Sequence, residues 1–511
     1  MPARAAARAM SGDDAYGPYP AHAFDLTTGA QADGLLRQAR WYFERETIAV
    51  PRDGVPVASF ARSTPAIDDV RAWAATWRDG DPIAYPPLVL VGARDTLRGA
   101  RMSGDGRTLD GLELRLVAKI PLNRSYFDPS SAAYLSKHPL TVRGTLHGDA
   151  FEMRIVWPDD FALASPPPPR EAANLRTLMR ETPRGGSEAP FASWTLWQRE
   201  RPGDRTDWTD RPVLALIVNG AQGDDDEAHA GHFAIVTGRI RADGRIGDWL
   251  VDNFYTLDSE SEKGIVAAPV TLDAYQGDLN SGQAWYRPSC LLVLVLRDER
   301  AVTLVQSALG RVYRQFYRHQ LVYYHPGNNC TSICVDTLRA LGWPIPARGP
   351  TSRVLAWLGF PWLVIRERSV AKAKIAFDYM CEDRTRLFPA AAMEDAYASV
   401  RALLRGAACE GRLGNMLAHD VDGIAFLRLP QLPSSRVPGD APVDSLAEYR
   451  ARLPKDRSKM QIVPAPPRPF PEALRDDDLL KPALHASDVA ARVWGAIAVI
   501  CVAALAMQLL R

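Results

Sequence analysis

The sequence NNCTSICVDTL, at positions 328–338, joins the end of a loop to the start of a helix at a cysteine. After Cys330, apolar residues recur at helical spacing, at Ile333, Val335 and Leu338. A thiol in the first turn of a helix lies near unpaired backbone N–H groups and near the positive end of the helix dipole, and both favour the thiolate. We therefore predict that Cys330 is a reactive cysteine at a helix N-terminus.

A histidine earlier in the chain is the expected partner of this thiol. The sequence GHFAIV, at positions 231–236, places His232 on an apolar strand or at its start. A thiol on a helix start that faces an imidazole on a strand is the working pair of many thiol hydrolases. We predict Cys330 as the nucleophile and His232 as the base, in a permuted order because the histidine comes first.

A hairpin after the His232 strand predicts the residue that orients the imidazole. The Asp-Gly pair at 243–244 indicates the turn. A two-residue loop places His232 across from Tyr255, and a four-residue loop places it across from Asn253. Side chains alternate between the faces of a strand, so Asp252 points away from His232 unless a bulge intervenes. We predict Asn253 as the orienting residue, with Asp252 as the second choice.

The residues around these two motifs resemble a known family. Gly231-His232 and the stretch YHPGNNCTS, at 324–332, are similar to the DUF4105 family, also called the Lnb N-terminal periplasmic domain family. That family lies within the permuted papain-like cysteine hydrolases (NlpC/P60 and lecithin-retinol-acyltransferase-like enzymes). Its second motif reads Asn-Cys-Thr-Thr, so Ser332 is a conservative departure. The resemblance covers about residues 190–350 and implies a thiol hydrolase or acyl-transfer fold.

The loop before the cysteine supplies the remaining candidate site residues. We assign Tyr324 and Asn329 to this oxyanion and loop region, and we expect the backbone N–H of Cys330 to contribute to the oxyanion hole. His325 is interpreted as a structural loop residue. Cys334 lies one helical turn after Cys330 and is interpreted as packing rather than as a resolving thiol.

Composition sets the frame for this site. The chain has 511 residues, of which 47% are hydrophobic and 24% charged, which is ordinary for a folded protein of two to three domains. The net charge of +1 favours no nucleic-acid partner. Six cysteines are too few for a disulfide scaffold. No Cys/His spacing matches a zinc site, no phosphate loop is present, and the acidic stretch 224–229 is interpreted as a solvated loop, so we predict no metal and no cofactor.

The expected fold class is α+β, with a permuted papain-like catalytic domain, an N-terminal mixed, strand-rich domain and a C-terminal transmembrane helix. The expected division is as follows: 1–24 disordered, 25–163 N-terminal domain, 164–184 Pro-rich linker, 185–350 catalytic domain, 351–428 helical extension, 429–488 Pro-rich linker and 489–511 transmembrane anchor.

The two ends of the chain suggest its location. Residues 493–510 are almost all apolar and are long enough to span a bilayer core, which predicts a single-pass C-terminal anchor in a membrane. The first thirty residues contain no apolar signal segment, so the catalytic domain is expected on the cytoplasmic side, or in the periplasm if the start codon is misplaced. A second apolar stretch, 354–365, is too short to span. It is either a buried helix broken at Pro361 or an interfacial helix that dips into lipid.

These observations predict a membrane-anchored cysteine hydrolase, similar to a peptidase or amidase, that works through a thioester intermediate. Its expected partners are a peptide, amide or acyl substrate and, through the C-terminal helix, a membrane. Two alternatives stay open, an acyltransferase of the lecithin-retinol type and a non-catalytic membrane adaptor with a decayed hydrolase fold. Labelling by iodoacetamide distinguishes the enzyme from the adaptor, because Cys330 should react fastest among the six thiols only in the enzyme.

Overall fold

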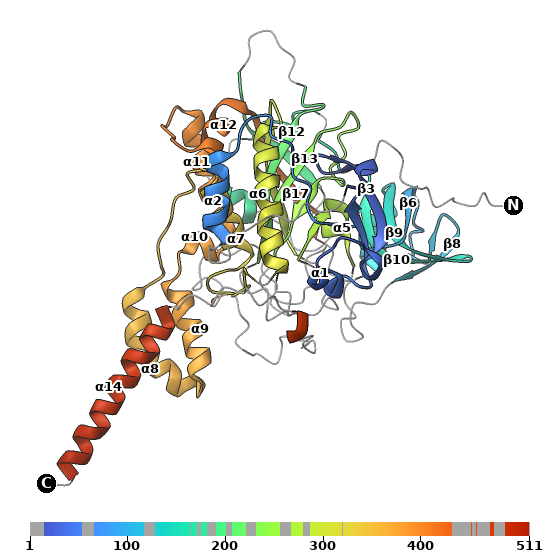
Figure 1. Cartoon of the computed structure of the whole chain (residues 1–511). Coiled ribbons are helices and arrows are strands. Elements are labelled where there is room, and N and C mark those ends of the chain that lie inside the picture. The colour runs from blue at the N-terminus through green and yellow to red at the C-terminus, as the bar shows by residue number, and fades with distance from the viewer. Residues whose placement is uncertain are drawn as a thin grey trace.

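The structure is a computed structural model. It describes residues 15–53, 66–116, 127, 129–163, 165–170, 175–180, 191–200, 207–220, 231–255, 267–279, 287–318, 320–431, 451, 456, 471–474 and 486–509. Within these residues the chain is α+β, with two strand-rich sheets in the body of the molecule and helices on its outside (Figure 1).

The largest element is a ten-stranded sheet, ordered β11-β17-β16-β12-β13-β14-β15-β5-β4-β3. Its strands are β3 (Phe24–Thr28), β4 (Thr47–Pro51), β5 (Val89–Leu90), β11 (Ala192–Gln198), β12 (Pro212–Asn219), β13 (His232–Arg239), β14 (Leu250–Asp252), β15 (Pro269–Thr271), β16 (Ser289–Leu296) and β17 (Val421–Leu429). Neighbours run antiparallel except β15 and β5, which are parallel. All residues of β12 and β16 are buried, as their continuous apolar runs predict.

Helices pack against the centre of this sheet. They are α2 (Ala66–Thr76), α6 (Arg300–Tyr317), α7 (Cys330–Ala340), α10 (Arg384–Leu387), α11 (Pro389–Leu404) and α12 (Arg412–Asp420). Contacts join α6 to β12 and β13, α7 to β13, and α11 to β12. The helix that begins at Cys330 therefore lies directly against the strand that begins at His232.

A five-stranded sheet, ordered β6-β9-β10-β8-β7, lies beside the main sheet (Figure 1). Its strands are β6 (Asp95–Ala100), β7 (Thr108–Leu109), β8 (Leu112–Leu116), β9 (Leu140–His147) and β10 (Ala150–Pro158). Further elements of the main body are β1 (Ala15–Tyr16), β2 (Tyr19–Pro20), α1 (Arg37–Tyr42), α3 (Pro129–Leu135), α4 (Leu175–Arg180) and α5 (Leu272–Gly277). Arg143 of β9 donates to Asp273 of α5 at 2.7 Å, and both side chains are buried. One continuous apolar cluster runs through both sheets.

The described residues do not follow the expected division of the chain. Tyr16 and Tyr19, in the segment expected to be disordered, are buried. Strands β3, β4 and β5 come from the expected N-terminal domain, yet they extend the sheet that contains His232. Strand β17 comes from the expected helical extension, yet it pairs with β16 and β11. The sheet around the site is thus assembled from segments far apart in the sequence.

Three helices form an appendage outside the main body (Figure 1). The helical appendage consists of α8 (Arg353–Glu367), α9 (Val370–Cys381) and α14 (Ala486–Leu509). It has a small apolar core of its own, around Ala356, Phe360, Ala373, Phe377 and Ala490. α8 continues through Pro361, so the alternative of a helix broken at this proline is wrong.

The expected transmembrane anchor, 489–511, is wrong. None of the helices among the described residues is both long and apolar enough to cross a membrane. The first turns of α14 pack on protein instead: Ser487 donates to Asp378 of α9 at 2.8 Å, and Lys374 of α9 forms an ion pair with Asp488. The predicted location, in a membrane through a single C-terminal span, is therefore wrong as well. The hydropathy of 493–510 gave no sign of these polar contacts at the start of the helix.

Candidate active site

Cys330 is the first residue of α7, as its sequence context predicts. The side-chain oxygen of Asn329 accepts from the backbone N–H groups of Thr331 and Ser332, each at 2.9 Å. The Ser332 hydroxyl in turn accepts from the backbone N–H of Asn329 at 2.8 Å, which completes a capping box. This cap fixes the first turn of the helix, and with it the position of the Cys330 thiol.

His232 is the first residue of β13 and is buried. Its Nε2 lies 2.5 Å from Oδ1 of Asn253, which is also buried. An amide oxygen can only accept, so this contact places the ring proton on Nε2 and leaves Nδ1 for the thiol. The structure therefore brings together Cys330, His232 and Asn253, the three residues that the sequence placed first.

The surroundings of Cys330 lower its pKa to about 7. Burial acts first and would raise the pKa, because it disfavours the thiolate. The charge of His232 and a hydrogen bond from its ring outweigh this effect, with help from the backbone N–H of Phe233 and the hydroxyl of Thr331. A lowered pKa raises the fraction of thiolate near neutral pH, and the thiolate is the form that attacks as a nucleophile.

The pairing of β13 with β14 explains why Asn253 contacts the histidine. Ile235 pairs with Asp252, and Thr237 pairs with Leu250. Continued along the strands, the same register places His232 opposite Tyr255. This is the register of the predicted two-residue loop, and Asn253 reaches the ring as a diagonal neighbour on the same face. Asp252 points the other way, where its Oδ2 accepts from Gln306 of α6 at 2.6 Å.

Asp252 has no direct part in this arrangement. It is buried, and burial raises its pKa well above the usual value. Since its one described partner is the amide of Gln306, this carboxyl lies in the protein interior beneath α6. The second choice for the orienting residue therefore does not contact the ring.

The two loop residues expected near the oxyanion site have structural contacts. The Asn329 side chain is occupied by the helix cap, and its amide nitrogen also donates to the carbonyl of His325 at 2.8 Å. The Tyr324 hydroxyl donates to Asp378 of α9 at 2.6 Å, away from the thiol. Instead, the hydroxyl of Tyr323 accepts from the backbone N–H of Cys330 at 3.4 Å. The residue beside the nucleophile is thus the neighbouring tyrosine, which the sequence did not single out.

A buried polar network lies next to His232, and the sequence analysis missed it. Asn219 ends β12 and pairs directly with His232 across the sheet. Its Oδ1 accepts from Tyr275 at 2.5 Å, and its Nδ2 donates to Ser289 at 2.7 Å and to Gln276 at 3.2 Å. The ring of Tyr275 lies 6.4 Å from the ring of His232. The available sequence signal was a single asparagine at the end of an apolar strand.

Other predicted features lie apart from this centre. The Cys334 thiol is buried, and burial raises its pKa, which fits a packing role. The acidic stretch 224–229 lies outside the described residues. Among the residues that are described, no group of three or more His, Cys, Asp or Glu side chains could hold a metal ion.

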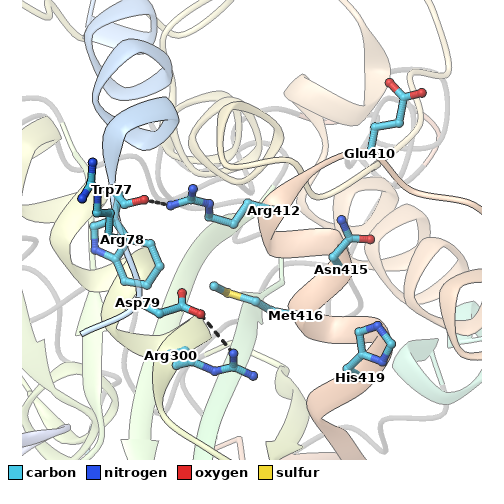
Figure 2. A pocket seen from close by; sticks show the side chains of 9 residues that line it. All are labelled: Trp77, Arg78, Asp79, Arg300, Glu410, Arg412, Asn415, Met416 and His419. Atoms are coloured by element: carbon cyan, nitrogen blue, oxygen red, sulfur yellow. Dashed lines mark hydrogen bonds and ion pairs between the residues drawn. The ribbon is translucent and has the colours of Figure 1, made fainter. Parts of the chain in front are cut away.

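A separate surface cavity lies where the end of α2 meets α6 and α12 (Figure 2). Asp79 pairs with Arg300 at 3.1 Å in its wall, and Arg412 donates to the backbone carbonyl of Trp77. None of the residues assigned to the thiol site lines this cavity. Asp79 and Arg300 thus form an ion pair across the cavity wall, and Arg412 links α12 to the end of α2.

Comparison with family models, with curated proteins and with solved structures found no match for this chain. The resemblance to permuted papain-like hydrolases therefore rests on the two sequence motifs, and the site geometry stands independently of it.

Proposed function

We propose that this protein is a cysteine hydrolase that cleaves an amide or related acyl bond through a thioester intermediate. The observation that carries the proposal is the lowered pKa of a helix-start thiol next to an imidazole that an amide orients. A buried cysteine without such a partner has a raised pKa, as Cys290 illustrates at about 12. Ionisation of one buried thiol near neutral pH is what nucleophilic catalysis requires.

The reaction would begin with transfer of the Cys330 proton to Nδ1 of His232. The sulfur then attacks the substrate carbonyl carbon, and a carbon–sulfur bond forms as the carbonyl π electrons move to oxygen. The backbone N–H of Cys330 donates to the hydroxyl of Tyr323 at 3.4 Å in the free protein, and we expect it to donate to that oxygen instead when substrate binds. Collapse of the intermediate breaks the bond to the leaving amine, which takes its proton from His232.

Water completes the cycle. His232 removes a proton from the water as it attacks the thioester, and the carbon–sulfur bond then breaks. The product acid leaves, and Cys330 regains its proton from the imidazole. Asn253 accepts from Nε2 throughout and so holds the ring in the orientation that both proton transfers need.

Turnover of an activated ester, such as p-nitrophenyl acetate, tests the proposal. We expect Cys330→Ala and His232→Ala each to lower turnover by about 10³-fold or more, because nucleophile and base act as one unit. Cys334→Ala is the matched control, since it removes the neighbouring thiol of the same helix and should retain activity. Equal rates for the wild type and Cys330→Ala would favour the non-catalytic adaptor instead.

A further inference from the structure

Exposed apolar side chains are concentrated on the helical appendage. Among the described residues, fifteen large apolar side chains are exposed, and twelve of them belong to α8, α9 and α14. Scattered apolar residues on a protein surface need no explanation, but a contiguous group marks an interaction site. Among the described residues, the appendage is therefore the strongest candidate for an interaction site.

One face of α8 carries the most exposed members of this group. They are Val354, Leu355, Leu358, Trp362 and Ile365, which are between 56% and 76% exposed. At 3.6 residues per turn, these five positions fall within an arc of about 100°. Ala356 and Phe360, on the opposite side of the helix, are buried against α9 and α14. α8 thus has two apolar faces, one buried within the appendage and one exposed. We call the five exposed residues the α8 outer face.

Basic residues outnumber acidic ones on the appendage. Arg366, next to the α8 outer face, lies over the Trp362 ring at 5.0 Å. Residues 353–381 and 486–509 contain six arginines and lysines and three aspartates and glutamates, which gives a net charge of +3. Asp488 pairs with Lys374, Glu367 pairs with Arg366, and Asp378 accepts from Ser487. The appendage that carries the α8 outer face is therefore positively charged.

We propose that the α8 outer face binds an anionic lipid surface, with α8 lying along that surface rather than across it. An apolar helix face with tryptophan and arginine at its edge, on an appendage of net positive charge, matches the boundary between acyl chains and negatively charged headgroups. A second copy of this chain is a poorer occupant, because two positively charged appendages would then face each other.

The appendage is connected to the loop that carries the nucleophile. Asp378 of α9 accepts from Tyr324, five residues before Asn329, and Arg386 of α10 donates to the carbonyl of Gly327 at 3.1 Å. Arg386 also pairs with Asp336 of α7 at 2.8 Å. An appendage bound to lipid would thus hold the thiol site to the same surface. The lipid binding itself does not depend on the proposed hydrolase activity.

Co-sedimentation of the full chain with vesicles tests this inference. We expect binding to vesicles of phosphatidylcholine mixed with phosphatidylserine, and about tenfold weaker binding to phosphatidylcholine alone, since several basic residues contribute to the attraction. The double variant Leu358→Glu/Ile365→Glu should lower binding to the mixed vesicles by about tenfold or more. Both side chains are exposed, so the variant should keep its fold, which circular dichroism checks.

The matched control is Leu26→Glu/Leu116→Glu, which adds the same charge at two exposed apolar positions outside the appendage. It should bind vesicles like the wild type. Equal binding by the α8 variant and the wild type would overturn the proposal, as would equal loss in both variants. A dimer in sedimentation velocity that the α8 variant abolishes would also overturn it, in favour of a second copy as the occupant.

Discussion

The sheet around His232 and the helical appendage use apolar residues in opposite ways. In β12, β13 and β16 the apolar side chains are buried, and buried polar ones form hydrogen bonds, such as Asn219 with Ser289 and His232 with Asn253. In α8 the apolar side chains lie on both sides of the helix, and the outer side has no cover among the described residues. Burial in the first region fixes a thiol and an imidazole, and exposure in the second leaves a surface for binding. The same apolar composition therefore serves chemistry in one region and contact in the other.

The largest expected effect comes from leucine truncations in the two regions. Leu216 of β12 is almost fully buried, so Leu216→Ala should lower the free energy of unfolding by about 2–5 kcal/mol. Leu358 of α8 is 68% exposed, so Leu358→Ala should change it by no more than about 0.5 kcal/mol. Chemical denaturation of both variants measures the difference. A large loss in the α8 variant would show that the α8 outer face is covered in solution.

A smaller effect separates the two candidates for orienting the imidazole. Asn253→Ala removes the acceptor for Nε2 of His232 and should lower ester turnover by about 10- to 100-fold, less than Cys330→Ala does. Asp252→Asn changes a side chain that contacts Gln306 and should leave turnover within about twofold of the wild type. The reverse order of effects would show that Asp252, not Asn253, orients the ring.

The smallest effect is a dependence of stability on pH. Burial raises the pKa of Asp252 in the folded state, so folding binds a proton there that the unfolded chain releases above about pH 4. The contribution of Asp252 to the free energy of unfolding is fully present below the pKa of the unfolded chain. It declines as the pH rises toward the pKa of the folded state. Asp252→Asn removes the decline, so the variant should gain in stability relative to the wild type as the pH rises above about 4. Urea denaturation at several pH values measures the gain, and parallel stability curves would contradict it.

The local parts of the site could be read from the sequence, and the distant parts could not. The helix start at Cys330 and the alternation of side chains around His232 and Asn253 depend on neighbours within one hairpin or one helical turn. Asn219 and β17 depend on pairing between segments that lie far apart in the chain, which no local pattern specifies. The contacts of Tyr323 and Tyr324 could not be predicted either, because side chains in a loop do not alternate regularly between two faces.

The C-terminal helix and α8 show the opposite error, in which a local rule was given too much weight. Hydropathy alone predicted a membrane span after residue 488 and did not foresee that Ser487 and Asp488 dock the helix on α9. A buried helix broken at Pro361 was one of the two alternatives for residues 354–365, but α8 continues through this proline and exposes one face. In both cases tertiary contacts, not composition, set the outcome.

The pH dependence of Cys330 alkylation tests the central claim most directly. Site-resolved mass spectrometry after brief iodoacetamide treatment would give the rate at Cys330 as a function of pH. The predicted rate rises with the thiolate and reaches half its maximum near pH 7, which is the lowered pKa of this thiol. In His232→Ala the midpoint should move upward, because only the weaker effects of the Phe233 N–H and the Thr331 hydroxyl then oppose burial. A wild-type midpoint well above 7 that His232→Ala leaves unchanged would contradict the Cys330–His232 pair.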